Sequence, residues 1–400
     1  MPTKSSINDD RVEDALLFYC ARTTINEKDT KQIHTLIRQF VDWDFLIRNA
    51  IHHRVVPLLY LNLSRICPDF IPIQHLHKLR YYYEKNARRN LFLTLELIKL
   101  IKLLEIEEIS AIPYKGPAIA FLAYGNICLR QFSDLDILVS PFDYLKTRYL
   151  LLQRGYRLAA DYGWECSLVD DSHGVCIDLH KGITPERFSI HLDFQFIKNR
   201  LIKLPVGSEK INTLCPENML IILCVQLAKD GCGSNPLRLS KICDIAELVR
   251  THQSMDWKRV FKEASRLGCQ RILLVALSAA NRLLGAQLPD LSLQSLANSN
   301  LSDLINHIHN KLIHSVVPSQ AGQLSAEDFY FKIRERWRDK LYPYYYYFKK
   351  RLVPNEMDHK FISLPESLNI LYYVVRPIRL VRYYSQLAWH TLKVKCLNWK

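Results

Sequence analysis

Apolar residues recur every three or four positions through residues 10–110, with few glycines between them. The spacing is clear in TKQIHTLIRQFV (30–41), in DWDFLIRNAIHHRVVPLLYLNL (42–63) and in KNARRNLFLTLELIKLIKLLEI (85–106). Such spacing places the apolar side chains on one face of a helix. The first part of the chain is therefore predicted to be helical.

The pattern changes at Ile112, where short alternating runs replace the helical spacing and Gly and Pro become more frequent. Alternating runs predict β-strands, because successive side chains of a strand point to opposite faces. A helix, PFDYLKTRYLLLQRG (141–155), separates two of the runs. The predicted strands are AIPY (111–114), DLDILV (134–139), YRLA (156–159) and GVCIDLHKGI (174–183).

Helical spacing returns from about Pro216 and continues, with polar connections, towards the end of the chain. We therefore expect an α+β protein in which a small α/β core is embedded in a mainly helical chain. The expected parts are an N-terminal helical region at 1–110, the α/β core at 111–215, a C-terminal helical region at 216–325 and a basic aromatic helical tail at 326–400.

Positive charge gathers in the tail. The chain has a net charge of +14, and residues 331–400 contain 15 Lys and Arg against 5 Asp and Glu. Aromatic residues interleave with the basic ones in WRDKLYPYYYYFKKR (337–351) and YYVVRPIRLVRYY (372–384). Such a segment can bind RNA phosphates and bases or an anionic membrane. It is more often an amphipathic tail whose tyrosines pack on the protein body, so both interpretations stay open.

The cysteine pattern and the apolar runs indicate the cellular compartment in which the protein is expected. Eleven cysteines occur without a CxxC pair, which favours a reducing cytoplasm and argues against a structural zinc site. The apolar runs fall far short of the roughly 20 residues that cross a bilayer. Acidic residues interrupt the first twenty positions, where a secretory signal would be apolar. We expect a cytoplasmic protein without a transmembrane segment.

Two Asp-x-Asp triplets occur in different contexts. Asp42 and Asp44 precede a helical apolar pattern, which suits helix capping and the helix dipole. Asp134 and Asp136 instead open a short strand, so both side chains lie on one face. Two carboxylates placed there repel each other unless a cation lies between them. Mg²⁺ is the expected cation, because it is hard and prefers oxygen ligands.

Neighbouring segments supply further candidates. Asp178 shares the polar face of its predicted strand with His180, and a third carboxylate suits a two-metal centre. Taken alone, Asp178 is more typical of a surface acid. Lys115 and Gly116 lie between a strand and a helix start, where backbone N–H groups can bind phosphate, although Lys-Gly-Pro is as typical of an ordinary turn. Arg130 is a second basic residue close to the acids.

The order of these motifs resembles the uncharacterised nucleotidyltransferase family of the polymerase-β-like superfamily, over nearly the full chain. The matching residues are Lys115-Gly116, Arg130, Asp134, Asp136, Gly155-Tyr156, Asp178 and His180. The resemblance implies a short mixed sheet with helices on one side, and transfer of a nucleoside monophosphate from an NTP such as ATP, with pyrophosphate released. It implies that Asp134 and Asp136 bind Mg²⁺, and that Asp178 completes the metal site and activates the acceptor hydroxyl. It also implies that Lys115, Gly116 and Arg130 contact the triphosphate.

Two functions remain as hypotheses. The leading one is a Mg²⁺-dependent nucleotidyltransferase acting on an unidentified hydroxyl of RNA, protein or a small molecule. The alternative is a catalytically degenerate binding module that docks on nucleic acid or a membrane through residues 331–400. Pro117 favours the alternative, because the wider superfamily usually has a serine beside the glycine that Gly116 matches.

Overall fold

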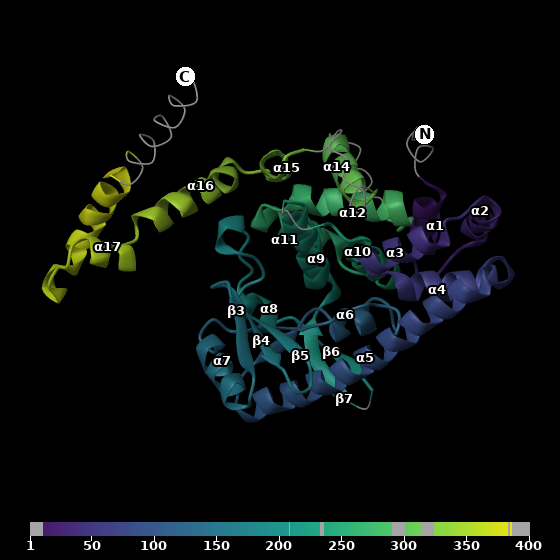
Figure 1. Cartoon of the computed structure of the whole chain (residues 1–400), viewed down its shortest axis with the longest axis horizontal. Helices are drawn as coiled ribbons and strands as arrows, with labels where there is room; N and C mark the ends of the chain where they lie inside the picture. The colour runs from purple at the N-terminus through teal and green to yellow at the C-terminus, as the bar shows by residue number, and fades with distance from the viewer. Residues whose placement is uncertain are drawn as a thin grey trace, which may run out of the picture. The chain divides into compact units, whose positions relative to one another are not determined.

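The computed structural model of the chain describes residues 11–207, 209–232, 236–289, 301–313, 324–382 and 385 (Figure 1). By internal contacts the chain divides into two compact units. The main unit comprises Met1–Glu186 and Ile190–Lys340, and the tail unit comprises Arg187–Ser189 and Leu341–Lys400. The division into four regions expected from the sequence remains a prediction.

Helices fill the first part of the main unit, as the apolar spacing predicts. They are α1 (Val12–Cys20), α2 (Glu27–Ile37), α3 (Trp43–His53), α4 (Val56–Ile66), the short 3-10 helix η1 (Pro68–Phe70) and α5 (Ile73–Ile106). Asp42 accepts a hydrogen bond from the backbone N–H of Phe45 at 2.9 Å, in the first turn of α3. This contact confirms the interpretation of the first Asp-x-Asp triplet as a helix start.

A mixed sheet follows the long helix α5, which contacts β1 and runs along the sheet region in Figure 1. The strands are β1 (Ala111–Pro113), β2 (Leu135–Val139), β3 (Arg157–Asp161), β4 (Glu165–Asp170) and β5 (Val175–His180). These described strands form a five-stranded sheet in the order β1-β2-β5-β4-β3. Only the β2–β5 pair of this sheet is parallel. Helix α6 (Pro117–Leu122) lies between β1 and β2, and α7 (Tyr144–Gln153) between β2 and β3. The α+β class is confirmed.

The sequence analysis does not predict β4 or the separate hairpin formed by β6 (Leu201–Val206) and β7 (Glu209–Leu214). Pro205 argues against a strand at the position of β6, because proline cannot donate a ladder hydrogen bond and is rare inside strands. In β4 only Cys166 and Leu168 are buried, so its apolar alternation is short. The 3-10 helix η2 (Glu186–Phe188) and helix α8 (Phe194–Lys198) precede the hairpin, which packs on β1 and α6.

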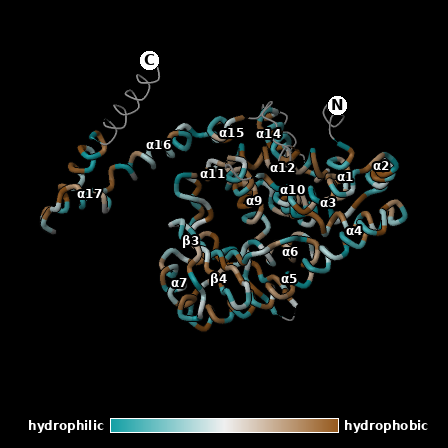
Figure 2. The backbone as a smooth tube through the Cα atoms, in the orientation of Figure 1, coloured by the Kyte–Doolittle hydropathy of each residue, from teal (hydrophilic) through white to brown (hydrophobic). Residues whose placement is uncertain are grey.

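Helices return after the hairpin, as expected from the sequence. They are α9 (Pro216–Gly231), α10 (Leu239–Thr251), α11 (Trp257–Leu267), α12 (Gln270–Leu284), α14 (Ser302–Ile313), α15 (Ala326–Ile333) and α16 (Trp337–Leu352). Helices α9, α10 and α12 pack on one another, and Figure 2 shows hydrophobic stretches along them. Asp256 caps α11 by accepting from the N–H of Arg259 at 3.0 Å.

The described part of the tail unit is also helical after α16. It contains α17 (Glu356–Phe361), the 3-10 helix η3 (Glu366–Leu371) and helical residues 372–382. Each cysteine in the described ranges is free, as the single spacing predicts. Across the same ranges, no helix combines the length and the apolar character needed to cross a membrane.

The junction of α3 with α10 predicts a pH-dependent stability. His53 is buried, and its Nδ1 accepts a hydrogen bond from the backbone N–H of Leu239 at 3.2 Å. Burial, aided by neighbouring His52, lowers the pKa of His53 to about 3. Its pKa in the unfolded chain is about 6.5, so between these values the unfolded chain binds a proton that the folded chain does not.

The stabilisation from neutral His53 is therefore fully present above about pH 6.5 and is lost as the pH falls, by up to about 1.4 kcal/mol per pH unit. We expect the free energy of unfolding in urea to fall more steeply between pH 7 and pH 5 for the wild type than for His53→Gln. Equal pH slopes for the two proteins would contradict this assignment.

Candidate active site

Strand register brings two of the predicted carboxylates side by side. Strand β2 pairs in parallel with β5 so that Asp136 lies opposite Asp178 and Leu138 lies opposite His180. Asp134 comes directly before β2, two positions before Asp136. Asp136 is buried, whereas Asp134 and Asp178 are half-buried. The three acids therefore occupy adjacent points on two neighbouring strands, at the edge of the core.

Asp136 is held as an anion by two basic partners. Lys115 Nζ donates to Asp136 Oδ1 at 2.5 Å, and His180 Nε2 lies 3.0 Å from the same oxygen. Burial opposes the charge, but Lys115 and His180 hold the pKa of Asp136 well below its usual range. Burial likewise opposes the charge of Lys115, and the carboxylate of Asp136 raises the pKa of Lys115 well above its ordinary value. The predicted phosphate contact Lys115 is thus placed against a predicted metal ligand.

Strand β4 adds two polar residues that the sequence analysis missed. It pairs with β5 in a register that places Ser167 opposite Asp178 and Glu165 opposite His180. Ser167 Oγ donates to Asp178 Oδ1 at 2.6 Å, and Glu165 Oε2 lies 3.1 Å from His180 Nδ1. A strand assigned to ECSLVD would have indicated both residues, since they alternate on one face.

The environment of Asp178 disfavours its charged form. Burial raises the pKa of Asp178, the hydrogen bond from Ser167 lowers it, and the negative charges of Asp136 and Asp134 raise it again. The pKa of His180 is also raised, but in this case the acidic neighbours favour the charged form. Burial would lower the pKa of His180, but the carboxylates of Asp136 and Glu165 raise it above its ordinary value. A row of alternating basic and acidic side chains therefore runs from Lys115 through Asp136 and His180 to Glu165.

Gly116 allows the turn after β1 to approach β2 closely. Its backbone has φ +51° and ψ −124°, a conformation that side chains with a Cβ rarely adopt. A Cβ at this position would lie 3.1 Å from the backbone oxygen of Asp134. Pro117 follows at the first position of α6, which suits its fixed φ. Glycine is therefore required here by backbone geometry.

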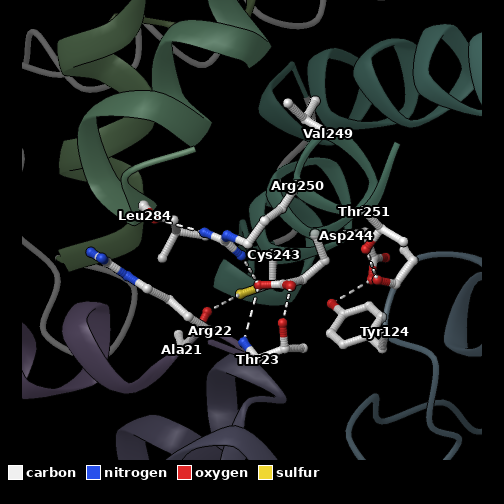
Figure 3. A network of polar contacts seen from close by, with 12 residues as sticks. Ala21, Arg22, Thr23, Tyr124, Cys243, Asp244, Val249, Arg250, Thr251 and Leu284 are labelled. Carbon is white, nitrogen blue, oxygen red and sulfur yellow. Dashed lines mark hydrogen bonds and ion pairs between the residues drawn. The ribbon is translucent and has the colours of Figure 1, made fainter. Parts of the chain in front are cut away.

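Arg130 is engaged in a buried ion pair. Its Nε and Nη2 donate to Asp244 of α10 at 2.8 and 2.9 Å, and its Nη1 lies 3.4 Å from the carbonyl oxygen of Gly116. Tyr124 donates its hydroxyl to the same Asp244 at 2.8 Å (Figure 3). Asn90 of α5 donates to the carbonyl oxygen of Arg130 at 2.7 Å. Arg130 thus anchors the loop before Asp134, and its predicted phosphate contact stays a prediction.

Arg54 is a further cation close to the acids. It ends α3 in the left-handed conformation, at φ 57°. Burial lowers the pKa of Arg54, the positive charge of Arg238 lowers it further, and the negative charge of Asp134 raises it. Among the described residues, no hydrogen bond or ion pair joins the carboxylate of Asp134. Arg54 is therefore a basic residue of the N-terminal helices that lies within electrostatic range of Asp134.

Lys229 of α9 lies near the Trp164 ring, next to the His180 end of the acid row. Its Nζ lies 5.4 Å from the centre of the Trp164 ring, and that ring lies 5.5 Å from the ring of His180. Burial lowers the pKa of Lys229, the negative charge of Asp230 raises it, and the positive charge of Lys115 lowers it again. Sequence reasoning could not find Arg54 or Lys229, because each lies on a helix far along the chain from the acids.

The predicted metal ligands fit a divalent cation by their chemistry. As the side chains stand, no group of three or more His, Cys, Asp or Glu residues in the described ranges is arranged to hold a metal ion. Burial raises the pKa of Asp178, and repulsion from the negative charges of Asp136 and Asp134 raises it as well. A hard cation shared by the three carboxylates would relieve that repulsion.

Comparison with known proteins gives one informative result. The family described as uncharacterised nucleotidyltransferase matches residues 39–285, which is more than half of the chain and contains all the site residues above. No match is found among the curated proteins. Among solved structures, the chain is similar to an antigenic nucleotidyltransferase-like protein from Paracoccidioides brasiliensis, at 16% identity over 49% of this chain and 93% of that chain. The TM-score of 0.32 is too low for that likeness to support any conclusion. From the family match, the chain belongs to the uncharacterised nucleotidyltransferase family, which supports a general role in nucleotidyl transfer.

Proposed function

We propose that this chain transfers a nucleoside monophosphate from an NTP, in the presence of Mg²⁺, to the hydroxyl of an acceptor. The observation that carries the proposal is the register of β2 on β5. This register sets Asp136 opposite Asp178, and Asp134 lies two positions before Asp136. All three acids lie within the family match. Carboxylates arranged on neighbouring strands are the ligands expected for metal-assisted phosphoryl chemistry.

Asp134, Asp178 and the second oxygen of Asp136 would hold one or two Mg²⁺ ions. Bound there, Mg²⁺ would neutralise the charge of the triphosphate and orient it for attack. The residues around the acids prepare this role. Lys115 and His180 keep Asp136 ionised, and Ser167 fixes one oxygen of Asp178.

The reaction forms one bond and breaks another. The acceptor oxygen attacks the α-phosphorus, the bond from that phosphorus to the bridging oxygen of the β-phosphate breaks, and pyrophosphate leaves with the bond electrons. Asp178 would accept the proton of the acceptor hydroxyl. Ser167 suits Asp178 to this role, because its hydrogen bond holds one carboxylate oxygen in place.

Cations around the acids would attract the triphosphate. Lys115, Gly116 and Arg130 are the contacts expected from the family resemblance. Arg54 and Lys229 add two more basic groups, and each is disfavoured in its charged form by burial and by a neighbouring cation. A polyanion placed among these groups would relieve their mutual repulsion, so we propose that they contribute to NTP binding.

Transfer can be measured without knowing the acceptor. We expect the purified full chain with Mg²⁺ to release pyrophosphate from an α-labelled NTP and to transfer the label to total RNA, to the chain itself or to a small-molecule hydroxyl. EDTA should abolish the signal, and added Mg²⁺ should restore it. If none of the four NTPs gives label transfer or pyrophosphate, the proposed function is wrong and the binding-module hypothesis is favoured.

A further inference from the structure

A buried acid fixes the orientation of the last described helix in the tail unit. Asp358 of α17 is fully buried and accepts from Arg376 Nη1 at 2.7 Å and from Arg379 Nε at 2.6 Å. Tyr372 also faces inward, because its hydroxyl donates to the carbonyl oxygen of Ile362 at 3.0 Å. One side of helical residues 372–382 is therefore fastened to α17.

The opposite side of that helix is apolar and exposed. Val374, Ile378 and Val381 follow one another at spacings of four and three, and Ile370 lies one turn earlier. Their exposed fractions are 59%, 59%, 70% and 76% in that order. At 100° per residue, Val374, Ile378 and Val381 point away from Arg376 and Arg379. We name these four residues the apolar stripe.

The tail unit that carries the apolar stripe is also positively charged. Residues 341–382 contain seven Lys and Arg against three Asp and Glu. Lys349, Lys360 and Arg382 are exposed, and Arg382 also lies over the Phe361 ring at 5.9 Å from its centre. Tyr344 and Tyr345 of α16 are exposed as well. An exposed aliphatic face, a basic border and exposed tyrosines are together typical of helices that lie in a membrane interface.

We propose that the tail unit binds the surface of an anionic lipid bilayer through the apolar stripe. Aliphatic side chains enter the boundary between headgroups and acyl chains, while the basic residues contact lipid phosphates and carboxylates. Single-stranded RNA fits the stripe less well, because bases stack on aromatic or free guanidinium planes, whereas Arg376 and Arg379 are held by Asp358. The apolar stripe and the basic residues around it lie in 341–382, outside the family match at 39–285, so this proposal does not depend on the nucleotidyltransferase activity.

Vesicle co-sedimentation of the full chain tests the proposal. We compare vesicles of phosphatidylcholine alone with vesicles that also contain about 30% phosphatidylserine, at physiological salt. Binding should be at least about tenfold stronger to the anionic vesicles, and Val374→Asp with Ile378→Asp should reduce it at least about tenfold. The matched control is Phe40→Asp, which places the same charge at an exposed apolar residue of the main unit and should bind like the wild type.

Thermal unfolding of the variants, measured in parallel, should match the wild type, because both substituted valine and isoleucine side chains are exposed. The proposal is overturned if the wild type binds neither vesicle, or if the stripe variant still binds as the wild type does. It is also overturned if RNA, but not anionic vesicles, binds at the same salt concentration. A dimer in light scattering that does not bind vesicles in co-sedimentation would overturn it as well, because the stripe would then serve as a dimer interface.

Discussion

Asp134→Asn is expected to abolish nucleotidyl transfer and leave the fold intact, whereas Asp136→Asn is expected to remove both activity and stability. Asp134 is half-buried and no described hydrogen bond or ion pair depends on its carboxylate. Its replacement therefore removes a predicted metal ligand alone. Loss of a ligand that neutralises phosphate charge should lower the rate of transfer by at least about a thousandfold.

Asp136 has a second role that the same substitution would expose. Its carboxylate is the partner of buried Lys115 and of buried His180. An amide there would leave the ammonium of Lys115 without a counter-charge, which destabilises a fold by about 3–5 kcal/mol. Denaturation in urea, run beside the transfer assay with a labelled NTP, should separate Asp136→Asn from Asp134→Asn.

The chain supplies its own control for this comparison. Asp44 is the second acid of the other Asp-x-Asp triplet and lies on the surface of α3, where it pairs with Lys78. Asp44→Asn should change neither transfer nor stability measurably. Wild-type transfer by Asp134→Asn would remove this triplet from the mechanism, and wild-type stability of Asp136→Asn would show that Lys115 does not depend on it.

The sequence predicts the central pair of strands well, because their information is local. The run DLDILV combines acids with a short apolar stretch, and GVCIDLHKG alternates clearly, so β2 and β5 and their acids could be located in advance. Their pairing in register follows from no local pattern. That pairing sets Asp136 opposite Asp178. The alternation of the second strand and the family resemblance indicated that the two acids belong to one site, but neither gave the register.

Contacts between distant segments could not be predicted. Ser167 and Glu165 lie on β4, a strand too short in apolar residues to be recognised, and they meet Asp178 and His180 only through the sheet. In the sequence, Arg130 looks like a free cation near acids. In the fold it pairs with Asp244, which lies 114 positions later in the chain. The sequence thus indicates which types of residue form the site. It does not show which of the charged residues, such as Arg130, are already in ion pairs.

Asp244→Asn is expected to destabilise the main unit more than any other single change in the anchoring network. Asp244 is 1% exposed and accepts two hydrogen bonds from Arg130 and one from Tyr124. An amide of the same size would leave a buried guanidinium without its counter-charge, at about 3–5 kcal/mol. The matched control is Tyr124→Phe, which removes one hydrogen bond to the same carboxylate and should lose about 1 kcal/mol.

The contacts of α10 prevent the helix from moving to make up for the lost Arg130–Asp244 pair. One turn after Asp244, fully buried Glu247 accepts from the backbone N–H of Thr23 at 3.2 Å and pairs with Arg250. Figure 3 shows Thr23 and Arg250 in the same network of polar contacts. The helix is therefore fastened to the segment between α1 and α2. It cannot shift toward Arg130 without breaking these contacts.

A double variant distinguishes the charge from the packing. Arg130→Met combined with Asp244→Leu removes both charges and keeps similar volumes, so it should recover most of the stability that Asp244→Asn loses. It should not recover transfer activity fully, because the contact from Arg130 to the carbonyl oxygen of Gly116 is lost with the guanidinium. If Asp244→Asn proves no more destabilising than Tyr124→Phe in urea, the pair does not anchor the loop. The approach of Gly116 to Asp134 would then depend on the two asparagines of α5, Asn86 and Asn90, which donate to the carbonyl oxygens of the same loop.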